Sequence, residues 1–222
     1  MTNEINTESR TALLNLIATH SFKLGDFTLA SGARSDYYID CRTTTLHAEG
    51  GRLSGLVFYE MLQQLPDAAN VRAVGGLTMG ADPLVSNTAS ASAWALAEYA
   101  EIRELAADLE LEPDADEAAP QLIHGFLVRK AEKAHGTGRR IEGFLQPGAH
   151  VVIVDDVCTT GGSTITAIEA TREAGMVVAG VLCLVDREQG GRANIEAAVP
   201  GVPFLAAFTA GDVRRAHLAL KK

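Results

Sequence analysis

The chain has 222 residues, of which 47% are hydrophobic, so it can form one sizeable core with at most a small appendage. Its apolar runs are far shorter than the roughly 20 residues that a membrane-spanning helix needs, and its N-terminus is too polar and acidic for a signal peptide. Its three cysteines have no CxxC spacing, which argues against a disulfide framework and a structural zinc site. We therefore expect a cytoplasmic, reduced protein with no membrane partner.

The formal net charge of −9 is concentrated in one segment. Between Glu98 and Glu117 there are nine acidic residues and one basic residue, Arg103, so this segment carries −8 of the total. Because the remainder is close to neutral, the net charge does not exclude an anionic substrate. A strongly acidic segment repels nucleic acid, and we expect no nucleic-acid partner.

Hydrophobic periodicity predicts helices and strands that alternate along most of the chain. In chain order, we expect a helix at 9–20, a hairpin at 22–42, a helix at 49–65, a strand at 71–74, a helix at 81–97, strands at 123–128 and 151–154, a helix at 163–174, strands at 177–185 and 204–208, and a helix at 213–220. The acidic segment 98–119 is interpreted as a solvated helical insertion. Its Ile102, Leu105 and Leu109 recur at helical spacing, and Pro113 is expected to end that helix.

Continuously apolar strands that alternate with helices predict a parallel sheet covered on both faces. The fold class is therefore α/β. In such sheets, ligands bind at the carboxyl ends of the strands, where the connecting loops meet. We expect a functional site at that edge.

The stretch VVIVDDVCTTGGS, at 151–163, places polar residues at the end of one of these strands. A helix that follows threonines, glycines and a serine presents backbone N–H groups and hydroxyls to an anion, so the stretch predicts a phosphate site that is not a Walker A loop. The adjacent Asp155 and Asp156 can bind two neighbouring hydroxyls or a water-bound Mg²⁺. A phosphate site beside a site for two neighbouring hydroxyls is suited to a ribose 5-phosphate. The alternative is that the acids only cap the following turn.

VVIVDDVCTTGGSTITA resembles the phosphoribosyl-pyrophosphate motif of type I phosphoribosyltransferases. In that family the two acids hold the ribose hydroxyls and the loop binds the 5-phosphate. The resemblance implies that phosphoribosyl pyrophosphate is bound by Asp155, Asp156, Val157, Cys158, Thr159, Thr160, Gly161, Gly162 and Ser163.

A basic segment at 129–143 follows the strand LIHGFLV. Dense positive charge on a glycine-bearing, pliable segment fits a lid that balances the charge of departing phosphates, although a solvated basic loop is the common alternative. Its RKxxKxHG pattern resembles the catalytic loop of orotate phosphoribosyltransferases, which reaches into the active site of the neighbouring subunit. The resemblance implies a homodimer with shared active sites, in which phosphoribosyl pyrophosphate is also bound by Arg129, Lys130, Lys133 and His135. Lys133 and His135 are the catalytic candidates.

A guanidinium at Arg187, in the stretch VDREQGG, can pair bidentately with a carboxylate, the group that distinguishes orotate from other pyrimidines. Local pairing with Asp186 or Glu188 is the alternative. VDRxxGG is similar to the orotate family, and the resemblance implies that Thr159 and Arg187 bind orotate.

The resemblance extends over most of the chain through two further stretches, FTLASGARSDYYIDCR and GGLTMGADP. The chain departs from the family pattern at two places. Ala30 stands where many members have a lysine, and Leu77-Thr78-Met79 stands where many have a cation in the pyrophosphate loop. Arg34 or backbone amides are the candidates for compensation. The acidic insertion has no counterpart that we can place.

The resemblance implies a single domain over 1–222, with a central parallel sheet flanked by helices and a small hood from about 1–45. It also implies transfer of ribosyl 5-phosphate from phosphoribosyl pyrophosphate to orotate, giving orotidine 5′-monophosphate and pyrophosphate in pyrimidine synthesis. The expected cofactor is Mg²⁺, carried by the pyrophosphate without direct protein ligands, with a water bridge to Asp155 and Asp156 as an option. The alternatives are another base-specific enzyme of this fold and a regulator that only senses phosphoribosyl pyrophosphate.

Overall fold

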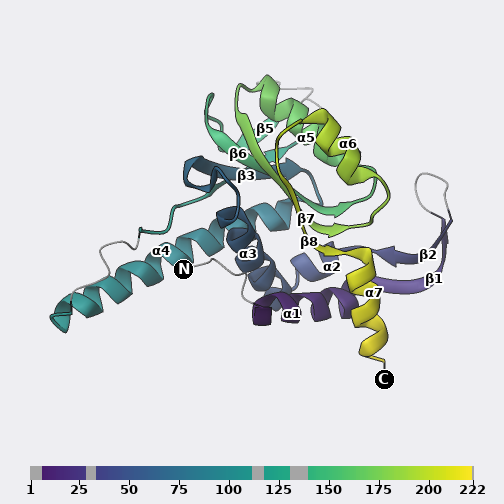
Figure 1. Ribbon diagram of the computed structural model, residues 1–222, viewed down its shortest axis with the longest axis horizontal. Helices are drawn as coiled ribbons and strands as arrows, with labels where there is room; N and C mark the ends of the chain where they lie inside the picture. The colour runs from purple at the N-terminus through teal and green to yellow at the C-terminus, as the bar shows by residue number, and fades with distance from the viewer. Residues whose placement is uncertain (1–6, 29–33, 112–117, 131–139, 222) are drawn as a thin grey trace.

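A six-stranded sheet forms the centre of the computed structural model, which describes residues 7–28, 34–111, 118–130 and 140–221 (Figure 1). The strand order is β5-β4-β3-β6-β7-β8. The bounds are β3 (Val71–Leu77), β4 (His124–Val128), β5 (Ile141–Gly143), β6 (His150–Cys158), β7 (Val177–Asp186) and β8 (Phe204–Thr209). All neighbouring pairs are parallel except β4 and β5. The predicted α/β fold with a parallel sheet is confirmed, with an antiparallel strand added at one edge.

Helices cover both faces of the sheet, as the continuously apolar strands predict. The helices are α1 (Thr7–Leu16), α2 (Arg42–Thr45), α3 (Ala48–Gln63), α4 (Asp82–Asp108), α5 (Gly162–Glu173), α6 (Gly191–Ala198) and α7 (Ala210–Ala219), with a π-helical turn at Ile17–Ser21 and a 3₁₀ turn at Ala68–Asn70. One core joins the sheet to α1, α3, α4 and α7, and a second joins it to α5 and α6. Val152 and Val154 of β6 belong to the first core and Val151 and Ile153 to the second, so this strand is buried on both faces. None of the helices in the described ranges is long and apolar enough to cross a membrane.

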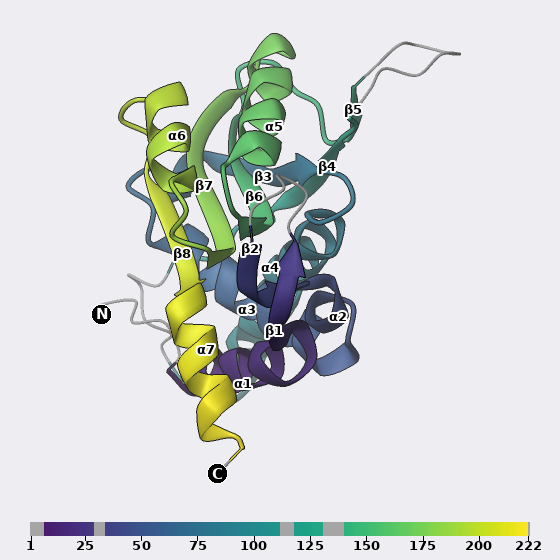
Figure 2. The same cartoon turned by 90° about the vertical axis from the view of Figure 1, so that its right-hand side faces the viewer.

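The predicted hairpin is confirmed and stands apart from the central sheet (Figures 1 and 2). Its strands β1 (Phe22–Thr28) and β2 (Arg34–Ile39) pair antiparallel and form the hood together with α2. Phe22 joins the hood to the core because its ring stacks on Tyr37 at 5.5 Å and lies 5.0 Å from the ring of His217 on α7.

Three elements, α2, β5 and α6, were not predicted from the sequence, and α2 has only four residues. The strand β5 has three residues and follows a glycine-bearing basic segment, so it is too short to show an alternating pattern. The helix α6 has eight residues, of which only Gly191 and Ile195 are buried. In addition, β6 continues through Asp155 and Asp156 to Cys158, so both acids belong to the strand itself.

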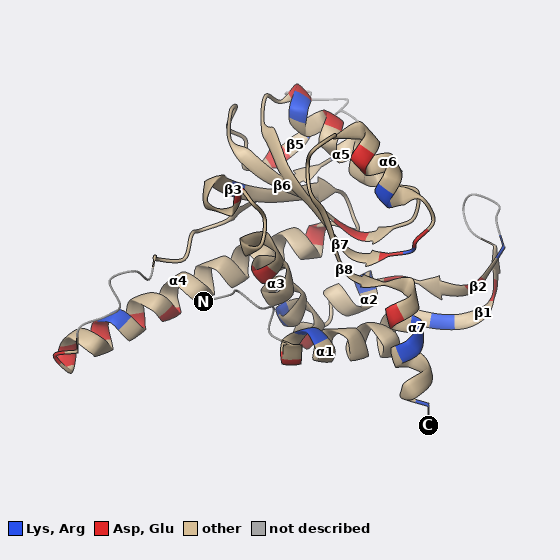
Figure 3. Ribbon diagram, in the orientation of Figure 1, with Lys and Arg blue, Asp and Glu red and all other residues tan. Residues whose placement is uncertain are grey.

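The helix α4 combines the predicted helix at 81–97 with the first part of the acidic segment. Its last buried residue is Ser92, whereas Trp94 is 76% exposed and Ile102 is 59% exposed. The far end of the helix extends away from the rest of the molecule and carries most of its acidic residues (Figure 3). The core therefore holds only the N-terminal half of α4.

The prediction that Pro113 ends this helix is wrong, because the helix ends at Asp108. Glu110 adopts a left-handed conformation with φ of 53°, and the next backbone N–H, that of Leu111, donates to the carbonyl of Ala106 at 2.9 Å. This is a Schellman-type C-cap, which closes a helix without help from proline.

Deletion of residues 100–118, with a short Gly/Ser bridge, is expected to change the free energy of unfolding by less than about 1 kcal/mol, because no residue of α4 beyond Ser92 is buried. Urea denaturation measures the change. Leu84→Ala, in the buried half of the same helix, is the control and is expected to cost about 2–5 kcal/mol. A deletion variant that is as destabilised as this control would contradict the prediction.

Candidate active site

A cavity of about 930 Å³ opens at the carboxyl ends of β3, β4 and β6. The hood contributes Tyr38, Ile39, Asp40 and Arg42; the connection from β3 to α4 contributes Leu77, Thr78, Met79, Gly80 and Asp82; the ends of β4 and β5 contribute Leu127, Arg129, Lys130 and Glu142; and β6 with α5 contributes Asp155, Asp156, Val157 and Ser163. The site therefore lies where the strand order predicts it, at the edge where the connecting loops meet.

Asp155 is the most buried carboxylate in this cavity, at 8% exposure. Thr164 Oγ1 donates to its Oδ2 at 2.7 Å, and the backbone N–H of Asp156 donates to its Oδ1 at 3.0 Å. Burial, followed by the neighbouring charge of Asp156, raises the pKa of Asp155 to about 7. Burial also raises the pKa of Asp156, whose Oδ1 accepts the backbone N–H of Val157 at 3.0 Å. Both carboxylates are thus partly desolvated, and this disfavours their charged forms.

Glycines allow the chain to pack closely around this pair. A Cβ on Gly80 would lie 2.4 Å from Asp156 Oδ1, so the connection between β3 and α4 lies directly against that carboxylate. Gly161 precedes α5 with φ of 80°, and a Cβ there would lie 2.9 Å from the carbonyl oxygen of Gly191. A side chain at either position would displace a wall of the site.

The turn between β6 and α5 leaves the first N–H groups of α5 free of helical hydrogen bonds, since the ladder begins when the N–H of Ile165 donates to the carbonyl of Gly161. Thr159, Thr160, Gly161 and Gly162 form this turn. Cys158 is buried beneath it, with its Sγ only 2.4 Å from where a Cβ on Gly191 would lie. The arrangement is suited to an anion at the start of α5.

The basic segment at 129–143 begins directly after β4 and ends in β5, and these two strands pair with each other. The backbone N–H of Arg129 donates to the carbonyl of Arg140 at 2.8 Å, and Arg129 Nη1 lies 3.5 Å from Glu142 Oε1 on β5. Arg129 and Lys130 line the cavity. The catalytic candidates Lys133 and His135 lie outside the described residues.

Arg187 is placed by β7 beneath the hood rather than in the walls of the described cavity. It is 8% exposed, its guanidinium lies 4.8 Å from the centre of the Tyr37 ring, and its Nη2 donates to Ser35 Oγ at 3.3 Å. Local pairing with Asp186 or Glu188 is not seen: Asp186 instead accepts the N–H of Glu188 and pairs with Arg192. Within the described ranges no carboxylate forms an ion pair with Arg187, which leaves a nearly buried cation without a counter-ion.

Arg34, a candidate to compensate for the lysine replaced by Ala30 and for the missing loop cation, does not line the described cavity. Arg34 pairs with Asp26 across the hairpin, its side chain is 72% exposed, and it borders a separate hollow of the hood.

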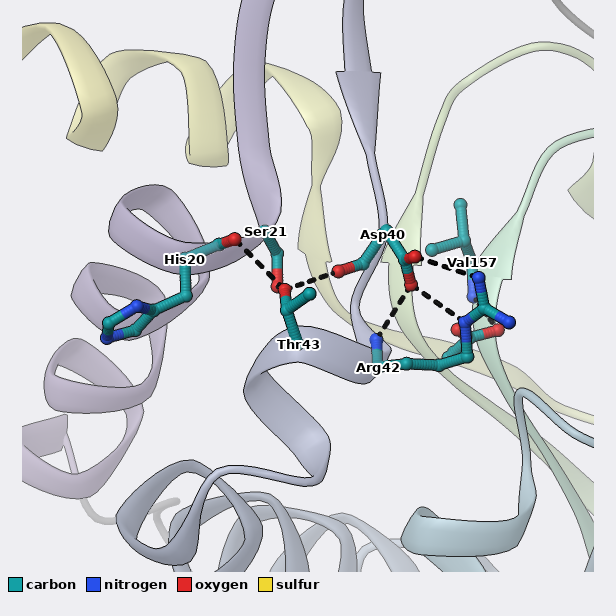
Figure 4. Close-up of polar contacts among 7 residues, drawn as sticks. His20, Ser21, Asp40, Arg42, Thr43 and Val157 are labelled. Atoms are coloured by element: carbon teal, nitrogen blue, oxygen red, sulfur yellow. Dashed lines mark hydrogen bonds and ion pairs between the residues drawn. The ribbon is translucent and has the colours of Figure 1, made fainter.

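The pair Asp40 and Arg42 in the cavity wall was missed by sequence reasoning. Arg42 Nε donates to Asp40 Oδ1 at 2.9 Å and its Nη2 donates to Oδ2 at 2.8 Å (Figure 4). This bidentate contact lowers the pKa of Asp40 and raises that of Arg42. The sequence did contain a signal for this pair, because Asp40 and Arg42 carry opposite charges and lie two residues apart, just after β2.

Comparison with known proteins agrees with the fold. Residues 127–202 match the family model "Phosphoribosyl transferase domain". This match over residues 127–202 points to the class of the phosphoribosyltransferases, and the relatives show that the chain as a whole belongs to it.

Relatives that align over most of the chain identify the family within this class. The chain is 41% identical to orotate phosphoribosyltransferase of Synechocystis sp. over 94% of this chain and 90% of the relative. It is 38% identical to that of Aquifex aeolicus over 92% and 97%. The crystal structure of Mycobacterium tuberculosis orotate phosphoribosyltransferase in complex with phosphoribosyl pyrophosphate superposes with a TM-score of 0.66 at 28% identity, over 93% of this chain and 99% of that one. The chain belongs to the orotate phosphoribosyltransferase family.

The raised pKa of Asp155 predicts how stability depends on pH. Because the folded protein binds this proton more tightly than the unfolded chain does, the stabilisation is complete below about pH 4 and is lost as the pH rises through 7. Relative to Asp155→Asn, the wild-type free energy of unfolding should fall by about 1.4 kcal/mol per pH unit across this window. Urea denaturation at pH 4.5, 6 and 8 measures it. Asp36→Asn is the control, since the pKa of Asp36 is lowered and no such fall is expected. A pH-independent difference between wild type and Asp155→Asn would contradict the assignment.

Proposed function

We propose that this chain transfers ribosyl 5-phosphate from phosphoribosyl pyrophosphate to orotate, releasing orotidine 5′-monophosphate and pyrophosphate. The observation that carries the proposal is the pair of buried Asp155 and half-buried Asp156, which a short turn separates from the N-terminus of α5 at the sheet edge. The related Mycobacterium tuberculosis enzyme was crystallised with phosphoribosyl pyrophosphate, which supports the donor substrate.

The ribose and its phosphate have separate partners in this assignment. The hydroxyls of the ribose donate to Asp155 and Asp156. The 5-phosphate accepts hydrogen bonds from the backbone N–H groups of the turn at 159–163 and of the first turn of α5, where the helix dipole favours an anion. A carboxylate pair is favourable here because two hydroxyl donors stabilise charges that burial disfavours.

Orotate is assigned to Thr159 and Arg187. A guanidinium that is nearly buried and has no carboxylate partner in the described ranges is suited to a ligand carboxylate, because pairing offsets its desolvation. Tyr37 and Ser35 hold that guanidinium in position from the hood.

The reaction needs no nucleophile from the protein. N1 of orotate attacks C1 of the ribose, the bond from C1 to the pyrophosphate oxygen breaks, and the N1 proton of orotate is lost. Catalysis therefore consists of stabilising a cation-like ribosyl centre and a polyanionic leaving group while water is excluded. Lys133 is the first candidate to stabilise the leaving group and His135 the second.

Mg²⁺ is proposed to travel with the pyrophosphate, where it neutralises part of the leaving group's charge. Carboxylate oxygens are suitable partners for this ion, and the proposal is that Asp155 and Asp156, which both line the cavity, contact it through water. Within the described ranges, no three His, Cys, Asp or Glu side chains are grouped to hold a metal ion by themselves.

The chain is also proposed to act as a homodimer, with the basic segment of each subunit closing over its partner's ligand. A reducing, cytoplasmic setting is proposed as well, and the free thiols of Cys41, Cys158 and Cys183 are compatible with it.

The decisive experiment is turnover of orotate with phosphoribosyl pyrophosphate and Mg²⁺, followed by the loss of orotate absorbance and by release of pyrophosphate. Turnover with uracil or a purine in place of orotate would point to another enzyme of the fold. Binding of phosphoribosyl pyrophosphate without release of pyrophosphate for any base would point to a regulator.

Arg187→Ala is expected to raise KM for orotate about 10- to 100-fold while KM for phosphoribosyl pyrophosphate changes little, because one charge-assisted pair is lost. Steady-state kinetics with each substrate varied in turn measures both constants. Tyr37→Phe, which removes a contact to Arg187 but keeps the ring, is the control for disturbance of the hood. Equal rises in both KM values would show that Arg187 is structural.

A mixed dimer tests whether the active site is shared. Lys133→Ala and Asp156→Asn are each expected to give nearly inactive homodimers. If the basic segment acts on the partner's site, random re-pairing of equal amounts makes about half the dimers mixed, each with one intact site, so roughly a quarter of wild-type activity should return. The assay follows activity after subunit exchange has been verified by mass spectrometry. Activity that stays at background would show that the segment acts within its own subunit.

A further inference from the structure

The described part of the cavity has an unfavourable charge balance for a pyrophosphate. Its walls carry three cations, Arg42, Arg129 and Lys130, against the carboxylates Asp40, Asp82, Glu142, Asp155 and Asp156. The loop at 77–80 contributes no cation, and Arg34 faces a separate hollow. Arg129 is already within 3.5 Å of Glu142. A cation on the β6 side of the cavity is therefore important for holding a polyanion.

Arg42 occupies that side. It shares the cavity wall with Asp156 of β6, and the two charges interact, since each shifts the pKa of the other toward its charged form, while Arg129 and Lys130 follow β4. β3 separates β4 from β6, which puts these two strands about 10 Å apart. A diphosphate above the loop that follows β3 would thus have a cation on each side.

The pair with Asp40 orients Arg42 without using all of its donors. Asp40 accepts from Nε and Nη2, so both N–H groups of Nη1 stay available to a ligand. The backbone N–H of Arg42 also donates to Asp40 Oδ1 at 3.1 Å, which fixes the carboxylate at the start of α2. Thr43 Oγ1 lies 2.9 Å from the carbonyl of Asp40 and 3.0 Å from that of His20, and it anchors the same turn to the π-helical turn Ile17–Ser21 (Figure 4).

We propose that Arg42 binds the pyrophosphate group of phosphoribosyl pyrophosphate in place of the cation that the loop at 77–80 lacks, and that Asp40 is the positioning residue for it. The proposal rests on the function proposed above. The guanidinium keeps its charge across the working pH range, and its fixed orientation reduces the entropy lost when an anion binds.

Binding of inorganic pyrophosphate, measured by calorimetric titration with Mg²⁺ present, tests the proposal without turnover. Arg42→Gln is expected to weaken binding about 10- to 100-fold, because a charge-assisted contact is lost. Arg34→Gln is the matched control, since it removes an arginine of the same hood that also pairs with an aspartate, and it should leave binding unchanged. Asp40→Asn keeps the cation but loosens its position, and a smaller loss of about 3- to 10-fold is expected.

Steady-state kinetics supplies a second measurement. Arg42→Gln should raise KM for phosphoribosyl pyrophosphate and leave KM for orotate unchanged. Arg42→Lys keeps the charge but loses the bidentate geometry, so its KM for phosphoribosyl pyrophosphate should lie between those of the wild type and Arg42→Gln. It replaces the Gln variant in the test if that variant does not fold. Wild-type affinity for pyrophosphate in both Arg42 variants, or an equal loss in Arg34→Gln, overturns the proposal. Pyrophosphate binding that depends on Arg42 in a protein that does not turn over orotate would refute the proposed function alone.

Discussion

Two adjacent carboxylates at the end of a strand that is buried on both faces are the constraint around which this molecule is arranged. Asp155 keeps its place through Thr164 and a backbone N–H, but these two donors do not offset its burial, and its pKa stays near 7. In the proposed function, the hydroxyls of a ribose would supply the missing donors, which would account for a charge that burial disfavours. A buried pair of this kind is a poor contributor to stability and a suitable binding group.

The surrounding loops are shaped by their close approach to this pair. Gly80 lies against Asp156, and Gly76 lies against the backbone of β6, where a Cβ would be 2.2 Å from the carbonyl of Val154. On the other side, Gly161 and Gly191 bring the starts of α5 and α6 together. Small residues at these four positions let the turn before α5, the two carboxylates and the loop after β3 share one edge of the sheet.

The hood holds two arginines in position, of which only Arg42 lines the described cavity. Arg187 comes from β7 and is held by Tyr37 and Ser35 of the hood, whereas Arg42 comes from the hood and shares the cavity wall with Asp156 of β6. The position of the hairpin therefore affects both the proposed orotate contact and the proposed pyrophosphate contact. The acidic half of α4, by contrast, extends away from the sheet and contributes nothing to the core beyond Ser92.

The sequence by itself determined the α/β class, the hairpin and the location of the site, because continuous apolar strands and the run DDVCTTGGS carry these features locally. It also indicated Arg187, although not that Tyr37 and Ser35 would be its neighbours. Only the tertiary structure placed Arg42 in the cavity with Asp156, moved Arg34 away from the cavity and added β5 to the sheet edge. These features depend on how the hood packs and on which strands pair, and both are contacts between segments far apart in the chain that no local pattern encodes.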